Sequence, residues 1–489
     1  MSLSSGPPGR PASGAPGHPA QPGTPMPRLS PVSGERHETD WGGVSLGLAL
    51  SCFVAFQQFK LPPVLPGLLA AFDYPRSLAA GFMSIYALIG LIASVPLGRW
   101  MKRRGYRPGL LIGIASTLAG LILALALARF GLALLLARGL EGLTYAIFAI
   151  AGPAIATASA RLKDLPLVTG LLAGWIPVGQ IGAGLLALAA PSLAPYDGLA
   201  DWQLIWLVAL ALTLVLGLFC WRSSHHRDVG MAERPAKAPT PVTADTVGRE
   251  SPAKSDHKDV EAAAQPRPAA QVAPTGPHLA APLGPAVARP PRLPNLLAAG
   301  IFLLWSAQYF AFMTWLTQFL IEQHHLQPQA AVLVYLLPVV VLLACNLLTG
   351  WALGHGLKLL PALLASLILQ GLVWALNPIL DGGLGIVALL VYGICAGVIP
   401  TCLFHLPHFI VAHQRHRAAG GNGARAAAKA GPEAFATLMT GRNIGVFCGP
   451  LLLPQLLGWL GNWNSTALVI AALTWLGAGF ALLLVRELR

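Results

Sequence analysis

Long apolar runs separated by short polar segments cover most of this chain of 489 residues. About 20 helical residues cross the hydrocarbon core of a membrane, which is about 30 Å thick, and each run reaches about that length. The pattern predicts twelve membrane-spanning helices. Their expected ranges are 41–60, 77–100, 108–128, 131–156, 165–190, 202–222, 295–320, 328–353, 357–377, 383–411, 433–457 and 463–486.

Two polar stretches divide these runs into two sets of six. Residues 1–40 are rich in Pro, Gly and Ser, and residues 223–294 are rich in Pro and Ala with charges of both signs. Neither stretch has enough apolar surface to fold, so we expect a disordered N-terminal tail and a disordered linker. The domains would then be six-helix bundles over 41–222 and 295–489. This arrangement is typical of a transporter built from two similar halves around a central path.

Composition supports a membrane protein and excludes several other classes. Hydrophobic residues make up 55% of the chain and charged residues 10%, with a mean hydropathy of +0.63, which is unusual for a soluble domain. The formal net charge of +13 could indicate a nucleic-acid partner, but the basic residues lie between apolar runs, without an RNA- or DNA-binding motif. We therefore expect the lipid bilayer, and no nucleic acid, as the partner of this surface.

Lys and Arg in the short loops predict the orientation in the membrane, because cytoplasmic loops carry an excess of them. With twelve spans, most of the basic loop residues fall on one side, and the opposite loops hold little besides Lys60, Arg76 and Arg129. Both termini and the linker should be cytoplasmic, in a multi-pass protein of the cell's inner membrane. The residues on the cytoplasmic side are Arg99, Lys102, Arg103, Arg104, Arg107, Arg161, Lys163, Arg415, Arg417, Arg425, Lys429, Arg486 and Arg489.

The segment GRWMKRRGYR, residues 98–107, resembles the GxxxDRxGRR loop of the major facilitator superfamily and lies between spans 2 and 3, as that loop does. The resemblance implies an all-α membrane protein of twelve transmembrane helices in two pseudo-symmetric six-helix bundles. In that family the loop touches neighbouring helices and helps to hold the outward-facing state. Here Lys102 stands where the family has Asp, so that charge contact should be missing. The expected gating residues are Gly98, Lys102, Arg103, Gly105 and Arg107, with the two glycines allowing close helix approach and a tight turn.

Further motifs resemble one branch of that superfamily. RGLEG, residues 138–142, is similar to the family's RxxxG motif in span 4. Together the remaining motifs resemble the cyanate-permease-like group, whose name implies little about the substrate. They are AGPAIATASARL after span 4, GWIPVGQIGAGL in span 5, NLLTGWALGHGL in span 8, GVIPTCLFHLPH in span 10 and GRNIGVFCGPLL in span 11.

Three ionisable residues lie inside predicted spans, where a charge costs roughly 2.5–3.5 kcal/mol and therefore needs a partner or a water-filled cavity. Arg138 and Glu141 are three residues apart and share one helix face. They could form a purely structural ion pair, or Glu141 could exchange a proton while Arg138 biases its pKa or meets an anion. Arg442 lies deep in span 11 and could contact an anionic substrate, snorkel to the cytoplasm, or pair with Glu433.

Neutral polar and aromatic residues complete the predicted substrate or coupling site, although each alone is more often a helix–helix contact. Spans 1, 4, 7 and 10 line the path in the family's fold, which favours Gln57, Gln308 and Tyr309 together with Arg138 and Glu141. The other predicted site residues are Trp175, Gln180, Asn346 and Asn443, besides Arg442; Gln58, Tyr86 and Trp305 are further polar or aromatic positions.

These features predict a secondary transporter of a small solute, expected to be an organic or inorganic anion, coupled to a solute or proton gradient because no phosphate-binding GxxxxGK[ST] sequence is present. We expect a monomer that is not an enzyme and has no cofactor or metal. The alternatives are an efflux facilitator of the same fold and a membrane-embedded sensor or channel. The histidines of span 10, His405, His408, His413 and His416, could be a solvated loop end, a pH-sensitive gate or a metal site.

Overall fold

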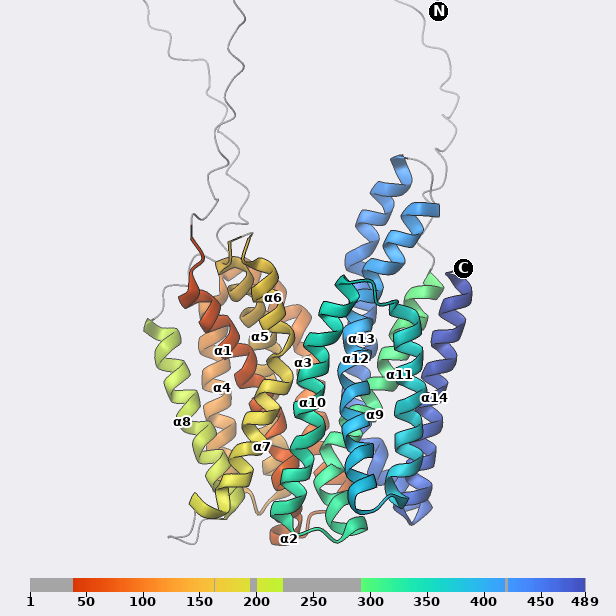
Figure 1. Ribbon diagram of the computed structural model, residues 1–489. Coiled ribbons are helices and arrows are strands. Elements are labelled where there is room, and N and C mark those ends of the chain that lie inside the picture. The colour runs from red at the N-terminus through yellow and green to blue at the C-terminus, as the bar shows by residue number, and fades with distance from the viewer. Residues whose placement is uncertain (1–37, 162, 194–199, 223–291, 418–420, 489) are drawn as a thin grey trace, which may run out of the picture.

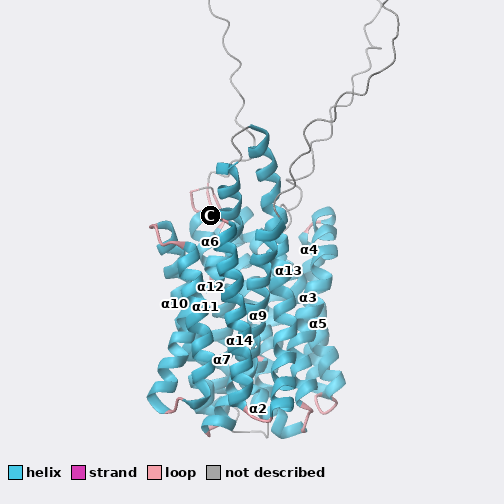
Figure 2. Ribbon diagram, turned by 90° about the vertical axis from the view of Figure 1, so that its right-hand side faces the viewer, coloured by secondary structure: helices cyan, strands magenta, loops and turns pink. Residues whose placement is uncertain are grey.

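The computed structural model describes residues 38–161, 163–193, 200–222, 292–417 and 421–488, and these residues fold into helices with no strand among them (Figures 1 and 2). The expected disordered tail and linker lie outside the described residues, except for residues 38–40 and 292–294 at their ends. Of the helices, twelve stretches are long and apolar enough to cross a membrane, which confirms the predicted all-α fold.

The described residues of the N-terminal half, on the left of Figure 1, form eight helices. Two predicted spans are interrupted: the first is broken at Lys60 and continues to Phe72, and the fifth is broken at Gly174. The helices are α1 (Trp41–Phe59), α2 (Leu61–Phe72), α3 (Arg76–Arg104), α4 (Tyr106–Leu127), α5 (Gly131–Ser159), α6 (Leu165–Ala173), α7 (Trp175–Leu193) and α8 (Asp201–Arg222).

In the C-terminal half, on the right of Figure 1, residues 292–417 and 421–488 form six α-helices and one short 3-10 turn. Three of them extend more than two residues past a predicted span end, because the polar residues that flank the apolar runs continue the helix. The elements are α9 (Arg292–His324), α10 (Pro328–Gly354), α11 (Leu359–Leu376), η1 (Asn377–Ile379), α12 (Gly382–Arg417), α13 (Gly421–Leu460) and α14 (Trp463–Glu487).

Equivalent helices pack together in the two halves. The second span contacts the fourth (α3 with α5), and the eighth contacts the tenth (α10 with α12). The first contacts the fifth (α1 with α7), and the seventh contacts the eleventh (α9 with α13). Repetition of the same pairs is the packing expected of two pseudo-symmetric six-helix bundles.

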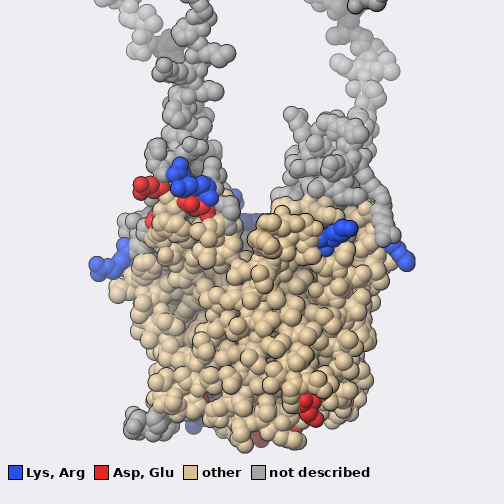
Figure 3. Space-filling view, in the orientation of Figure 1, with Lys and Arg blue, Asp and Glu red and all other residues tan. Residues whose placement is uncertain are grey.

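The boundary between the halves has the same symmetry. Helix α3 packs against α13 and α7 against α10, which pairs spans 2 and 11 and spans 5 and 8, while α2 contacts α9. Figure 3 shows the surface dipping between the two halves on the edge from which the termini leave, and a belt of uncharged residues around the middle of the visible face. A central path would therefore run between α1, α2, α3 and α7 on one side and α9, α10 and α13 on the other.

Candidate functional site

Prolines break the first span and leave backbone carbonyls for other helices to use. Pro62 and Pro63 follow Lys60, and a proline has no N–H with which to close the turn four residues back. Of the carbonyls left free, Gln58 O accepts from Arg138 Nη2 at 3.3 Å. Pro66 likewise releases the carbonyl of Pro62, which accepts from Thr317 Oγ1 of the other half at 2.6 Å. The local sequence KLPPVLP therefore creates acceptors for Arg138 of the same half and for Thr317 of the other half.

Lys60 is completely buried at this break. Its Nζ lies 2.8 Å from Glu141 Oε1 and 2.6 Å from Gln57 Oε1, and 4.4 Å from the centroid of a Trp206 ring. The side chains of Lys60 and Glu141 are both 0% exposed. The prediction that Lys60 belongs to a loop after the first span is therefore wrong, because that span runs on past it for twelve more helical residues in α2.

Arg138 completes the cluster from the same helix as Glu141. Its Nη1 bonds Glu141 Oε2 and donates to Gln57 O at 2.8 Å, and its Nε donates to Phe82 O at 3.2 Å. The guanidinium also lies 4.7 Å from the ring centroid of Tyr86, whose hydroxyl donates to Val54 O. We call Lys60, Arg138 and Glu141 the buried triad: two cations and one carboxylate that tie α1, α3 and α5 together.

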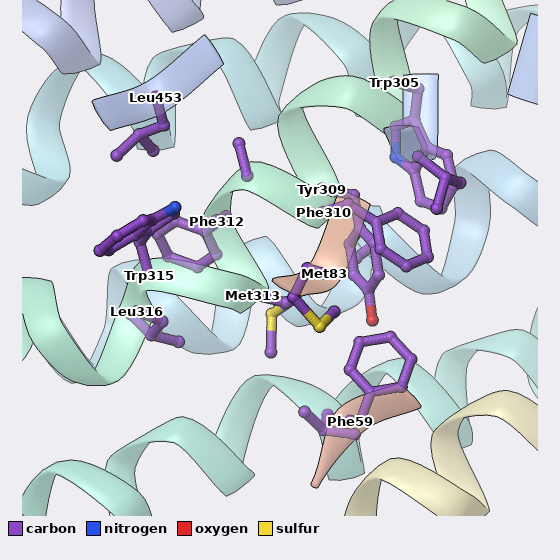
Figure 4. Close-up of a cluster of buried hydrophobic side chains, with 14 of the residues drawn as sticks. Phe59, Met83, Trp305, Tyr309, Phe310, Phe312, Met313, Trp315, Leu316 and Leu453 are labelled. Atoms are coloured by element: carbon purple, nitrogen blue, oxygen red, sulfur yellow. The ribbon is translucent and has the colours of Figure 1, made fainter. Parts of the chain in front are cut away.

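A second group of polar residues lies where the two halves meet. Gln180 of α7 donates to Tyr335 Oη at 2.8 Å and accepts from Tyr309 Oη at 3.0 Å, so one amide links α7 to α10 and α9. Phe59, next to Lys60, stacks on Phe310 with ring centroids 5.7 Å apart (Figure 4). The predicted residues Gln180 and Tyr309 therefore do meet, across the central boundary.

Arg442 lies at the same boundary on α13 and is 8% exposed. Its guanidinium carbon is 6.0 Å from the ring centroid of Phe310, and its Nη1 donates to Asn443 Oδ1 at 3.1 Å. No carboxylate of the described side chains lies within ion-pair distance of it; the side chain of Glu433, the alternative partner, is outside that set. Nearby, Trp305 stacks on Tyr309 at 5.2 Å, and its buried Nε1 has no hydrogen-bond acceptor.

The other predicted residues lie apart from these two clusters. Gln308 faces the interior of the C-terminal half, where its Oε1 accepts from Trp374 Nε1 at 2.6 Å and from Tyr392 Oη at 3.2 Å. Asn346 accepts from Thr401 Oγ1 and donates to Ala173 O of the other half at 3.4 Å. Trp175 packs, half-buried, against the core of the N-terminal half.

The predicted gating loop is a single tight turn between α3 and α4. Gly105 has a φ of 84°, which a glycine adopts without strain, so the expected turn is confirmed. A Cβ on Gly98 would meet only Ile150, at an ordinary 3.5 Å, so the expected close helix approach there is wrong. Lys102 and Arg103 are exposed in the last turn of α3, and Arg107 lies 5.6 Å from a Trp221 ring centroid.

The structure describes the side chains of two of the four histidines of span 10. His405 Nδ1 lies 2.9 Å from Thr401 O, and His408 is exposed. His413 and His416 belong to the end of α12, whose side chains are outside the described set. Within that set, no group of three or more His, Cys, Asp or Glu residues could hold a metal ion, so the structure adds nothing in favour of a metal site.

The fold and the motifs agree with one protein family. The sequence model of the Major Facilitator Superfamily matches residues 47–430, which is most of the chain. The chain belongs to the major facilitator superfamily. It is therefore a secondary transporter, a multi-pass membrane protein that moves a solute, and not an enzyme. A search of curated proteins finds no match, and the cyanate-permease-like branch stays a prediction.

An ion pair joins the two halves of this transporter at the end away from the termini. Arg76 Nη2 of α3 lies 2.6 Å from Glu322 Oε1 of α9, and Glu322 Oε2 also accepts from Trp463 Nε1 at 3.1 Å. Both members of the ion pair are partly exposed, so we expect a contribution of at most about 1 kcal/mol, or about fivefold in the closed population.

Charge reversal tests whether this pair keeps that end closed. Arg76→Glu places two carboxylates together, and we expect a cysteine at Thr317, which is 1% exposed, to react about fivefold faster with a membrane-impermeant thiol reagent. The measurement needs a background without the native cysteines. The double reversal Arg76→Glu/Glu322→Arg should restore slow labelling, whereas equal labelling of all three proteins would contradict a closing role.

Proposed function

We propose that the solute is a small organic or inorganic anion and that Arg442 binds it. The single observation that carries this proposal is a nearly buried cation, at the boundary between the halves, with no carboxylate beside it among the described side chains. An uncompensated charge in the membrane interior is costly, so the site is completed by an anion. The free Nε1 of Trp305 and the ring of Phe310 support a ligand here, because they supply a donor and an apolar wall.

Arg138 has a different part in this proposal. The sequence allowed it to meet an anionic substrate, but its donors are engaged by Glu141 and by backbone carbonyls of α1 and α3. We therefore assign Arg138 to holding Glu141 and the broken first span in place. Arg442 is left as the cation that is available to a solute.

Proton coupling through the buried triad forms the second part of the proposal. Glu141 is buried and bonded to two cations. One of them, Lys60, directly follows Phe59, which stacks on Phe310 at the boundary between the halves. A change of charge in the triad would therefore act on the residues that pack the two halves together. This placement supports transport driven by a proton gradient.

We further propose a monomer in the inner membrane, with both termini in the cytoplasm. The basic last turn of α3 lies at the same end as the C-terminus, as the excess of positive charge on the cytoplasmic side would require (Figure 1). The cross-half bonds Thr317–Pro62 and Arg76–Glu322 then close the opposite side, and the surface dips between the halves on the cytoplasmic side (Figure 3). These contacts favour an arrangement that is open toward the cytoplasm.

A matched ligand panel tests the anion site. Purified protein would be melted with carboxylates, each paired with its own neutral amide, such as benzoate with benzamide and acetate with acetamide. We expect at least one carboxylate to raise the melting temperature more than its amide does, and Arg442→Gln to remove that difference while a lysine in the same place keeps part of it. If no carboxylate exceeds its amide, or if Arg442→Gln leaves the difference unchanged, the anion proposal fails.

A further inference from the structure

The buried triad contains two groups that could exchange a proton. Uptake by Glu141 would raise the net charge of the triad, whereas release from Lys60 would lower it. Arg138 stays protonated at every physiological pH, so only Glu141 and Lys60 can change. We infer that Lys60, and not Glu141, carries the exchangeable proton of this transporter. The inference deepens the proposed proton coupling and rests on it.

The charge balance of the triad separates the two candidates. With Lys60 as ammonium and Glu141 as carboxylate, the triad has two cations and one anion, all at most 1% exposed. A proton on Glu141 would leave Lys60 and Arg138 as two buried cations beside a neutral acid, with no anion in the cluster. Release from Lys60 instead leaves the Arg138–Glu141 pair, which is neutral overall. Membrane interiors disfavour net charge strongly, so exchange at Lys60 avoids the costly state.

The hydrogen bonds around Lys60 can accommodate both of its forms. In the ammonium form, Nζ donates to Glu141 Oε1 and Gln57 Oε1, and the amide nitrogen of Gln57 is buried without an acceptor. On release, the N–H bond breaks, the electron pair stays on Nζ and the proton passes to water that enters from one side of the membrane. A flip of the Gln57 amide then lets Nε2 donate to that lone pair. The donor that has no partner in one form is therefore satisfied in the other.

The surroundings of Lys60 supply no other charge among the described side chains. Helix α5 presents Arg138 and Glu141, and α3 presents the Tyr86 hydroxyl one contact further away. Helix α8 presents the Trp206 ring, whose Nε1 is buried without an acceptor. Helix α9 approaches through Phe310 and Thr317, which are uncharged. The charge of Lys60 is thus balanced by the triad alone.

The position of Lys60 explains how its proton could be coupled to the solute. The preceding residue, Phe59, stacks on Phe310, and Phe310 faces the guanidinium of Arg442. Two residues after Lys60, the carbonyl of Pro62 holds Thr317 of the other half. The packed rings of Phe59 and Phe310 therefore connect Lys60 to the proposed anion site. The same segment, residues 59–62, helps to close the end away from the termini.

Spectroscopy without any solute tests the assignment. The full chain, with lysine labelled with ¹⁵N at Nζ, would be placed in lipid nanodiscs and titrated between about pH 5 and about pH 9, a range in which exposed lysines stay charged. We expect one lysine signal to shift from ammonium to amine, and to be absent from Lys60→Arg, because a guanidinium keeps its charge. If Lys60→Arg does not fold, replacing each of the other lysines in turn identifies the same signal.

Infrared difference spectra over the same pH range test the alternative, that Glu141 carries the exchangeable proton. A protonated Glu141 would give a carboxylic-acid C=O band that is lost in Glu141→Gln. We expect no such band. Such a band, or a Lys60 signal that stays ammonium throughout, would overturn the assignment to Lys60. Because neither measurement uses a solute, a failed carboxylate panel would reject the proposed anion site and leave the assignment of Lys60 to be decided by the spectra alone.

Discussion

Replacing Glu141 with Gln should destabilise the folded protein by about 3–5 kcal/mol, the usual cost of removing one partner from a buried ion pair. The loss is large because the variant leaves Lys60 and Arg138 buried beside each other without a carboxylate, and both contact Glu141 in the folded protein. Equilibrium unfolding in mixed micelles would measure the free energy, and melting in detergent would show the same order of stabilities.

Two further variants isolate the effect of charge from that of shape. Lys60→Met keeps the neutral Arg138–Glu141 pair, so we expect a smaller loss than for Glu141→Gln. The double variant Lys60→Met/Glu141→Gln has one uncompensated cation instead of two, so it should be more stable than Glu141→Gln alone. A Glu141→Gln protein that unfolds like the wild type would show that the triad carries no stabilising charge pair.

Replacing Gly445 with Val should cost about 3 kcal/mol or more, because two helix backbones meet at this residue. A Cβ on Gly445 would lie 2.2 Å from Leu303 O of α9, closer than any real contact. Gly441 and Gly449, one turn to either side, would meet Ala299 O and Ala307 O at 2.2 Å and 2.1 Å. Small residues spaced by four are the usual means of bringing membrane helices this close.

Gly479 of α14 offers a matched control, since nothing lies within 4 Å of its Cβ position. We expect Gly479→Ala to melt like the wild type or slightly higher, because Ala favours a helix more than Gly does. Gly445→Val should lose the monodisperse peak in size-exclusion chromatography after mild heating. Comparable melting temperatures of the two variants would show that α13 can move away from α9 without loss of stability.

Much of the fold could be predicted from the sequence, and the exceptions have physical causes. The spans follow from apolar length alone, and the turn at Gly105 follows from its glycine. The predicted end of span 1 at residue 60 was wrong because a lysine and two prolines usually indicate a loop. In the structure the helix restarts at once in α2, since the charge of Lys60 is balanced by Glu141, which is distant in sequence.

The candidate site was predicted in part. Arg138 and Glu141 share a helix face by spacing, and the structure does pair them. Gln180 and Tyr309 were predicted as separate site residues and meet across the two halves, whereas Gln308 lies with Trp374 inside one half. A signal for Lys60 was present, because a lysine followed by Pro-Pro inside a long apolar stretch combines free carbonyls with a charge that needs a partner.

The sequence by itself determined the class of the protein, the twelve spans, the two halves and the presence of charges inside the membrane. These are local properties, because burial in lipid depends on the apolar length of each segment and not on its neighbours. Only the tertiary structure decided which charges are paired. Lys60 and Arg138 share Glu141, while Arg442 lies without a carboxylate among the described side chains at the boundary of the halves. Such pairing depends on distances between helices far apart in the chain, and packing alone determines those distances.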